Sequence, residues 1–305
     1  MATTESIVNQ PATPTPFQHI SGSRKIKNAL ATALVTVAFL IALVPLGWLL
    51  VTVITRGFDA ILSANWWSHS LSGVMPDEFA GGVYHALYGS IIQGLICAVI
   101  AVPLGIFTAI YLVEYGAGGR LARAVTFMVD ILSGVPSIVA ALFIFALWIS
   151  VLGFPQSAFA VSLALVLLML PVVVRSTEEM LRLVPDELRE ASYALGVPKW
   201  KTIARVVLPT ALSGMVTGVM LALARVLGET APVLILVGYS RSINFNVLEG
   251  NMASLPLLIY NELVSNPEAA GQLRAWGAAL TLIIVIMILN LIAAASSRFS
   301  AIKNK

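Results

Sequence analysis

Arg225 and Glu229 are the two charged residues within an otherwise apolar stretch that runs from Val206 to Gly238. In a membrane, a charge at the centre of a helix costs about 2.5–3.5 kcal/mol on insertion scales, so each charge needs a partner or a function. The spacing of four residues allows an internal ion pair on one helical face. The second interpretation is that Arg225 offers its planar guanidinium to an oxyanion in a passage. Glu229 then holds Arg225 in position and tempers its charge, so that the anion can also leave.

The same stretch contains residues that resist a continuous helix. Gly228 and Pro232 lie beside the charged pair, and a proline lacks an N–H group and clashes with the preceding helical turn. The stretch is also too long for one straight span at about 1.5 Å per residue. We therefore predict a broken span over 206–238, in which Gly228, Pro232 and Pro209 determine the break and the packing.

The composition indicates that this stretch lies in a membrane. Of the 305 residues, 58% are hydrophobic and 11% are charged, whereas a soluble domain carries about 25% charged residues. So few charges cannot supply the surface of a soluble protein of this size. The single cysteine, Cys97, excludes an internal disulfide and a multi-cysteine metal site. We expect a polytopic, all-α membrane protein.

The uncharged gaps, together with the run from Val206 to Gly238 that Arg225 and Glu229 interrupt, define six apolar segments that can cross a bilayer, which requires about 20 helical residues. The gap from Ile131 to Val174 is long enough for two spans, joined by a turn at Gly153–Ser157. The segments are uniformly apolar, unlike the alternating strands of an outer-membrane barrel. The predicted spans cover about 28–55, 84–113, 129–152, 157–175, 206–238 (broken) and 275–296. They form a transmembrane domain over 28–298, between a disordered N-terminal tail at 1–27 and a C-terminal tail at 299–305.

The basic residues predict the orientation of the chain. With the N-terminus inside, every Lys and Arg faces the cytoplasm except Arg56, Arg225, Arg241 and Arg274, which agrees with the positive-inside rule. Both termini are therefore expected in the cytoplasm, with the chain in the plasma membrane. The net charge of +3 reflects this topology and does not indicate nucleic-acid binding.

The longest cytoplasmic loop, 176–205, is the only strongly polar stretch of the chain. Pro185 is well placed to open a short helix in it, and Gly196 ends that helix. The sequence Glu190-Ala191-Ser192, with Gly196 six residues after the glutamate and Leu208-Pro209 further on, resembles the EAA loop of ABC-importer permeases. The resemblance implies a type I permease fold with a coupling helix that sits in a groove of an ATPase subunit, formed around Glu190, Ala191, Ser192 and Gly196. The alternative is an amphipathic interfacial helix without a partner.

Three further blocks resemble the phosphate-import permeases of bacteria. They are Ala101–Tyr115, Gly134–Val139 and Ala222–Pro232, and the last is similar to the PstA branch rather than to the paralogous PstC branch. The resemblance extends from about residue 30 to the C-terminus. It implies phosphate as the substrate and the lipid of the bacterial inner membrane as the surroundings. It also implies three protein partners: a PstC-like permease in a heterodimer, a PstB-like ATPase dimer and a PstS-like phosphate-binding protein.

No catalytic site, cofactor or metal site is expected in the chain itself. No lysine follows a glycine, so a Gly-x-x-x-x-Gly-Lys phosphate loop cannot exist. ATP and Mg²⁺ would therefore be bound by the partner ATPase. There is no Ser/His/Asp grouping typical of an enzyme, and His69 and His85 are too isolated to suggest metal ligands.

Other polar and small residues have structural interpretations. Gly214 and Gly218 are expected in close helix packing, although their spacing is too common by chance to define a dimer face. Glu114 and Asp130 are expected to be solvated caps at the ends of spans, with Glu114 within reach of the ATPase.

Three other functions stay open. A permease of an ABC importer for sulfate or molybdate shares the EAA loop and would differ in the block around Arg225. An ion-coupled secondary transporter would need no ATPase, and the EAA spacing disfavours it. A purely sensory membrane protein is the third.

Overall fold

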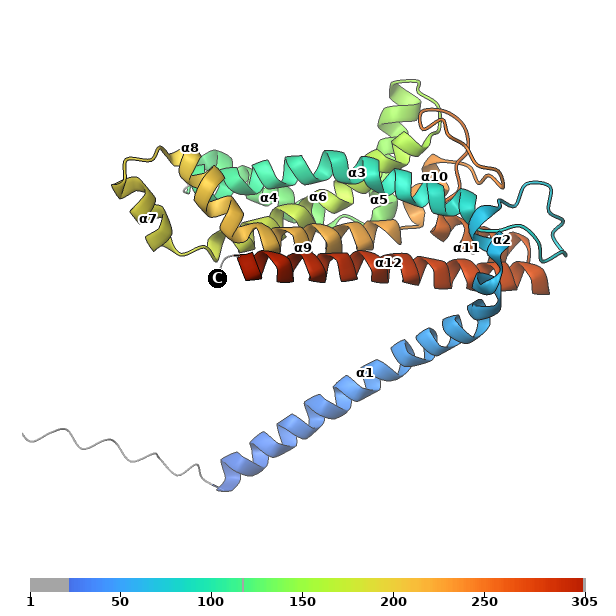
Figure 1. The fold of residues 1–305 in the computed structure, drawn as a ribbon, viewed down its shortest axis with the longest axis horizontal. Coiled ribbons are helices and arrows are strands. Elements are labelled where there is room, and N and C mark those ends of the chain that lie inside the picture. Colours follow the sequence, from blue (N-terminus) through green and yellow to red (C-terminus); the bar gives the residue numbers. More distant parts are fainter. Residues whose placement is uncertain (1–21, 117, 304–305) are drawn as a thin grey trace, which may run out of the picture. The chain divides into compact units, whose positions relative to one another are not determined.

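The computed structural model describes residues 22–116 and 118–303, which form helices joined by loops and contain no β-strand (Figure 1). The all-α expectation is confirmed. The α-helices are α1 Gly22–Leu62, α2 Ala64–Ser68, α3 Tyr84–Ile110, α4 Arg120–Gly134, α5 Ser137–Ile144, α6 Ala158–Arg182, α7 Asp186–Ala194, α8 Lys199–Thr202, α9 Leu208–Leu227, α10 Ala231–Leu236, α11 Leu255–Ser265 and α12 Ala269–Lys303. Short π-helices are η1 Tyr111–Tyr115, η2 Phe145–Val151 and η3 Ile203–Val207.

The chain divides into two units, 1–52 and 53–305. The described part of the first unit is entirely helix α1. Of the predicted N-terminal tail, 1–27, only residues 22–27 are described, and they belong to α1. Residues 299–303 of the predicted C-terminal tail continue α12.

Five of the described helical stretches are long and apolar enough to cross a membrane, and a bent pair raises the number to six. The five are α1, α3 with η1, α6, the run Lys199–Leu227 and α12 up to Ala295. The pair consists of α4 and the helix Ser137–Val151, which meet at 107°. The span expected over 129–152 is therefore not one straight helix. Val135 and Pro136 are both extended there, because the residue before a proline avoids the helical region.

Helices α3, α6, α9 and α12 form the core of the second unit and run side by side (Figure 1). Helix α6 packs on both α3 and α9, and α9 packs on α12. Many of the fully buried side chains are small, among them Ala101, Ala141, Ala158, Ala160 and Ala164. Small residues allow the close backbone approach that holds helices together in a membrane, where lipid is as apolar as the side chains.

Gly214 and Gly218 show how closely α9 approaches α6. A Cβ atom on Gly218 would lie 2.5 Å from the hydroxyl of Ser176, and one on Gly214 would overlap the side chain of Met180. The packing expectation for the two glycines is confirmed, and the helix that they contact belongs to the same chain.

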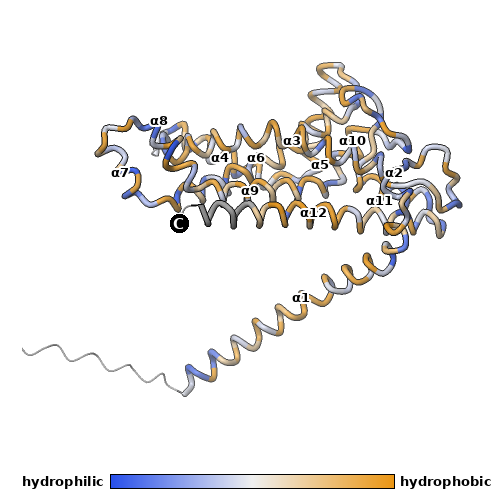
Figure 2. The backbone as a smooth tube through the Cα atoms, viewed as in Figure 1, coloured by the Kyte–Doolittle hydropathy of each residue, from blue (hydrophilic) through white to orange (hydrophobic). Residues whose placement is uncertain are grey.

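The two ends of the second unit are more polar than its middle. Figure 2 shows apolar residues along the long helices and hydrophilic residues at the ends. Helices α7 and α8 form one end, and α2 and α11 lie at the other (Figure 1). We refer to these as the α7–α8 end and the α11 end.

Candidate functional site

The fifth predicted span is divided into α9 and α10 by a break at Gly228–Thr230. Gly228 closes α9 with φ −88° and ψ −3°, and its N–H donates to the carbonyl of Arg225 at 3.2 Å. Pro232 lies in the first turn of α10. A helix continued from α9 would bring its ring against the carbonyl of Gly228, four residues earlier. Pro232 therefore favours a break at this point, although Pro45, Pro103 and Pro171 lie inside continuous helices.

Pro209 lies where η3 gives way to α9. The ring of Pro209 would clash with the carbonyl of Arg205 in a regular α-helix. The wider π-turn of η3 spans that carbonyl, which is a common way for a helix to accommodate such a residue. The helix thus continues from Lys199 to Leu227 through Pro209.

The break lies deep in the helix bundle. Leu227, the last residue of α9, is in contact with the backbone of Gly94 in α3, because a Cβ atom on Gly94 would lie 2.5 Å from Leu227 Cδ2. Gly94 follows Tyr84, the first residue of α3, by about 15 Å of helix at 1.5 Å per residue. The break therefore lies against α3 within the bundle, at the end of the helical run Lys199–Leu227.

The ion pair that the spacing of Arg225 and Glu229 allows is not formed. Arg225 is exposed on α9 and has neither an ion-pair nor a side-chain hydrogen-bond partner within the described residues. Glu229 follows the end of α9, so the geometry of residues i and i+4 in a continuous helix no longer holds for the two side chains. The guanidinium of Arg225 is left available to a ligand or to another subunit.

Arg225 is one helical turn from a shallow groove between α6 and α9. Leu221 lines the groove nearest to Arg225 in sequence, together with the hydroxyl-bearing residues Ser176, Ser213 and Thr217. Ser176 and Thr217 donate their hydroxyl hydrogens to the carbonyls of Val173 at 3.3 Å and Ser213 at 3.0 Å. In the described structure the hydroxyl of Ser213 is therefore the one in this groove that is left to donate to an oxyanion.

Glu229 is half-buried and lines a small polar cavity with Ser90, Gln93 and Ser254. Gln93 is 2% exposed, and its amide nitrogen has no partner among the described groups. The hydroxyl of Ser90 accepts a hydrogen bond from the N–H of Leu255, the first residue of α11, at 2.8 Å. Gln93 was not among the predicted site residues, although a lone glutamine within the apolar run of α3 is a detectable signal.

The predicted coupling residues form a compact turn at the α7–α8 end. Glu190, Ala191 and Gly196 are exposed, whereas Ser192 is buried. The hydroxyls of Ser192 and Thr202 are 2.8 Å apart and join α7 to α8.

Gly196 ends α7 with a φ of +73°. Its N–H donates to the carbonyl of Tyr193 at 2.9 Å, and the N–H of Val197 donates to that of Ser192 at 3.2 Å. Two such bonds around a left-handed residue form a Schellman motif, in which glycine is favoured because it has no Cβ atom. The glycine six residues after Glu190 is thus required by the end of the helix.

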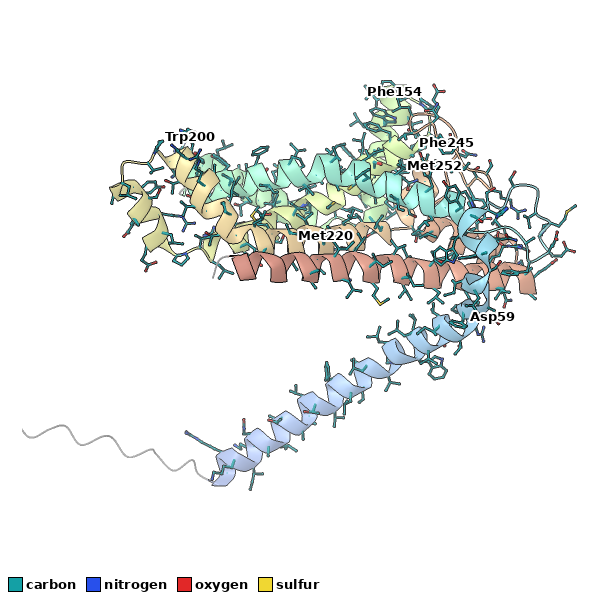
Figure 3. The ribbon with its side chains drawn as sticks, in the orientation of Figure 1. Asp59, Phe154, Trp200, Met220, Phe245 and Met252 are labelled. Atoms are coloured by element: carbon teal, nitrogen blue, oxygen red, sulfur yellow. The ribbon has the colours of Figure 1, made fainter. Side chains whose placement is uncertain are left out.

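Large apolar side chains are exposed around this turn. Leu195 is 84% exposed and Trp200 is 66% exposed, and Leu183, Leu188 and Tyr193 are exposed nearby. Figure 3 shows Trp200 at the α7–α8 end, well away from Phe154 and Phe245. An exposed apolar surface with a polar rim is typical of a protein contact.

Glu114 is buried, so its interpretation as a solvated cap was wrong. The carboxylate of Glu114 accepts hydrogen bonds from Arg189 of α7, with Oε1 3.1 Å from Nε and 3.0 Å from Nη2. The side chains of Glu114 and Arg189 are 5% and 12% exposed. Asp130, also expected to be a cap, is exposed and pairs with Arg175 of α6.

The described residues contain no group of three or more His, Cys, Asp or Glu side chains that could hold a metal ion. His85 is buried in α3 and has no hydrogen-bond partner for either ring nitrogen in the described part of the chain.

A family model described as "Binding-protein-dependent transport system inner membrane component" matches residues 101–301. The chain is 64% identical over 304 residues to the "Phosphate transport system permease protein PstA 1" of Mycobacterium tuberculosis (strain CDC 1551 / Oshkosh), covering 100% of this chain and 99% of that protein. It is 67% identical over 288 residues to the "Phosphate transport system permease protein PstA" of Mycobacterium leprae (strain TN), covering 94% of each.

Two crystal structures have a similar fold. The alginate ABC transporter in complex with an alginate pentasaccharide-bound periplasmic protein matches with a TM-score of 0.63 and 14% identity, covering 90% of this chain and 96% of that chain. The inward-facing MetNI methionine ABC transporter matches with a TM-score of 0.57 and 20% identity, covering 72% of this chain and 94% of that chain. At these identities the similarity concerns the fold, which is that of ABC-importer permeases.

Proposed function

The chain belongs to the binding-protein-dependent transport system inner membrane component family, and from that premise we propose that it is the permease subunit of an ATP-driven phosphate importer. The proposal takes phosphate from the names of the relatives with 64% and 67% identity. The observation within the chain that carries it is the free guanidinium of Arg225, just before the break between α9 and α10.

Arg225 and Glu229 have separate roles in this proposal. Arg225 donates hydrogen bonds to a phosphate oxygen, which its planar arrangement of N–H groups suits. Glu229 does not pair with Arg225 in the described structure, and it places a negative charge within the break. A neighbouring carboxylate weakens the hold of the arginine on the anion, so that the anion can leave again.

The proposed assembly contains three kinds of partner. A PstC-like permease completes the passage next to Arg225, a PstB-like ATPase dimer supplies ATP hydrolysis and binds ATP and Mg²⁺, and a PstS-like protein delivers phosphate. The chain itself has no ATP-binding phosphate loop, which supports a purely transporting role.

The α7–α8 end is proposed to face the cytoplasm and to contact the ATPase. Basic residues at this end, Arg182, Arg189, Lys199 and Lys201, support the orientation because cytoplasmic loops carry an excess of Lys and Arg. The exposed side chains of Leu195 and Trp200 support the contact. Glu190, Ala191 and Gly196 lie on the same exposed turn.

The test is phosphate uptake by the complete complex in proteoliposomes. Arg225→Gln should lower uptake by about 10- to 100-fold, the effect of losing a hydrogen bond to a charged group worth about 1.5–3 kcal/mol. Arg225→Lys keeps the charge without the planar donors, so its phosphate uptake should lie between that of the wild type and that of Arg225→Gln. Arg123→Gln, at an exposed arginine of α4 without an ion pair in the described structure, is the control and should retain uptake.

Normal uptake by Arg225→Gln would contradict the role of Arg225. Uptake of sulfate or molybdate without uptake of phosphate by the wild-type complex would contradict the substrate. Uptake by the purified chain without any ATPase would contradict the dependence on ATP.

A further inference from the structure

Arg189 holds three segments together at the α7–α8 end. Besides the carboxylate of Glu114, it donates to the carbonyls of Leu181 at 2.9 Å and Val184 at 2.7 Å, and to the carboxylate of Asp186 at 3.0 Å. Leu181 belongs to α6, and Asp186 is the first residue of α7. All three nitrogens of the guanidinium are therefore engaged, and α7 is fixed to the ends of α3 and α6.

The other arm of the coupling turn reaches the same residue. The ammonium group of Lys199, the first residue of α8, donates to the backbone carbonyl of Glu114. It also lies 5.0 Å from the centre of the Tyr115 ring, within the range of a cation–π interaction. Both helices that flank the Gly196 turn are thus attached to η1 at the end of α3.

Helix α3 connects this attachment to the proposed passage. It runs from Glu114 to Gln93 over about 30 Å at 1.5 Å per residue. In the N-terminal half of α3, Gln93 and Ser90 line the cavity with Glu229. Gly94 contacts Leu227 at the break that follows α9. Helix α3 and η1 are continuous between these contacts, with Pro103 inside α3, and a continuous helix with contacts at both ends can carry a displacement from one site to another.

We propose that the Glu114–Arg189 ion pair is the latch through which movement of α7 is passed to α3, and that Glu114 is a positioning residue for transport. This inference rests on the proposed function. When the ATPase moves α7, Arg189 pulls on Glu114, and α3 moves against the break of α9. The pair is buried and makes two charge-assisted hydrogen bonds, which are stronger than neutral ones, so movement of α7 acts on Glu114.

Movement of α7 could also pass directly into α9. The proposal is specific because it excludes this second route. Helix α7 also contacts η3, and Ser192 bonds to Thr202 beside it. Movement along this route would reach α9 through Pro209 without involving Glu114. The latch proposal assigns the transmission to α3.

The experiment compares the ATP hydrolysed with the phosphate imported by the complete complex in proteoliposomes. Glu114→Gln keeps the shape of the side chain and removes the ion pair. The ATPase should still copurify and hydrolyse ATP, whereas phosphate imported per ATP should fall by about tenfold, within the range of typical coupling between sites. Asp130→Asn is the matched control, since it breaks the ion pair with Arg175 at the same end without touching α7, and its ratio should be unchanged.

The double variant Glu114→Gln with Arg189→Gln removes both charges and leaves no buried charge unpaired. It should show the same low ratio as Glu114→Gln alone, because both break one latch. Glu114→Asp keeps the charge, so it should import more phosphate per ATP than Glu114→Gln and less than the wild type.

An unchanged ratio in an assembled Glu114→Gln complex would overturn the latch and favour the route through η3. Failure of both Glu114→Gln and the double variant to assemble would also overturn it, because the pair would then be required for folding. These results differ from failure of the proposed function, in which the wild-type complex itself imports no phosphate. If the wild-type complex imports another anion, the ratio for that anion tests the latch in the same way.

Discussion

The carboxylate of Glu262 in α11 and the guanidinium of Arg274 in α12 form an ion pair that is closed to solvent, with Glu262 Oε2 2.9 Å from Arg274 Nε. The side chains are 0% and 2% exposed. Arg274 also donates to the carbonyls of Glu78 at 2.6 Å and Pro76 at 2.8 Å. The pair therefore joins α11, α12 and the loop between α2 and α3 at the α11 end.

Glu262→Gln is expected to lower the free energy of unfolding by about 3–5 kcal/mol, because Arg274 would remain as a buried charge without a counterion. Thermal and denaturant unfolding of the detergent-solubilised protein measure the change. Glu268→Gln is the control, because Glu268 is exposed in the connection between the same two helices and should change stability by about 0.5 kcal/mol at most. Equal free energies of unfolding for the two variants would show that the ion pair does not contribute to stability.

Gly89→Ala should be more damaging than its size suggests. A Cβ atom on Gly89 of α3 would overlap the backbone carbonyl of Ala253, just before α11, and lie 3.0 Å from Met252 Cγ. A backbone carbonyl cannot rotate away as a side chain can, and overpacking of this kind costs about 1–3 kcal/mol. The unfolding temperature should fall for Gly89→Ala.

Gly134→Ala is the matched control for that substitution. No atom outside its local surroundings lies within 4 Å of a Cβ atom at Gly134, and its φ is not positive. Because Gly134 is the last residue of α4 and alanine meets no clash there, the unfolding temperature of Gly134→Ala should stay close to that of the wild type. A fall of equal size in both variants would contradict the close approach of α3 to Ala253.

The apolar runs and their interrupting charges were sufficient to predict the membrane helices and the break near Gly228, because both are properties of local sequence. The break depends on Pro232 and the carbonyl four residues before it, a spacing that is visible in the sequence. The 107° bend between α4 and α5 was not predicted. Val135 and Pro136 interrupt the helix locally, but the angle depends on what the two pieces pack against.

The polar contacts between distant segments could not be predicted. Glu114 and Arg189 are 75 residues apart, and either one alone is typical of a solvated helix end. The same limit applies to Arg225 and Glu229, because the ion-pair interpretation assumes a helix that continues through Gly228, and α9 ends before it. Gln93 carries no charge and so does not stand out as Arg225 does, although a buried amide also needs a partner.

The break of α9 should depend on Pro232 more than on Gly228. Gly228 has a negative φ, and a Cβ atom there would meet only the Arg225 carbonyl at 3.5 Å, so Gly228→Ala should keep phosphate uptake close to wild type. Pro232→Ala restores an N–H group and removes the clash with the Gly228 carbonyl, which lets α9 extend toward α10. Phosphate uptake should fall for Pro232→Ala. It should fall further for the double variant Gly228→Ala with Pro232→Ala. Similar uptake by all three variants would mean that packing around the break, and not the proline, maintains it.

Gly196 offers a way to separate backbone conformation from side-chain bulk at the coupling turn. Its φ is +73°, and a Cβ atom at this position would have no neighbouring atom within 4 Å, so a substitution meets no clash but must adopt the left-handed conformation. That conformation costs an ordinary residue about 1–2 kcal/mol, whereas asparagine adopts it more readily. Gly196→Ala should therefore loosen the turn between α7 and α8 and lower phosphate imported per ATP, and Gly196→Asn should lower it less. The ratio in proteoliposomes measures this order. A greater loss with Asn than with Ala would reverse the argument, because the larger side chain would then be obstructing the contact with the ATPase while the turn itself stayed intact.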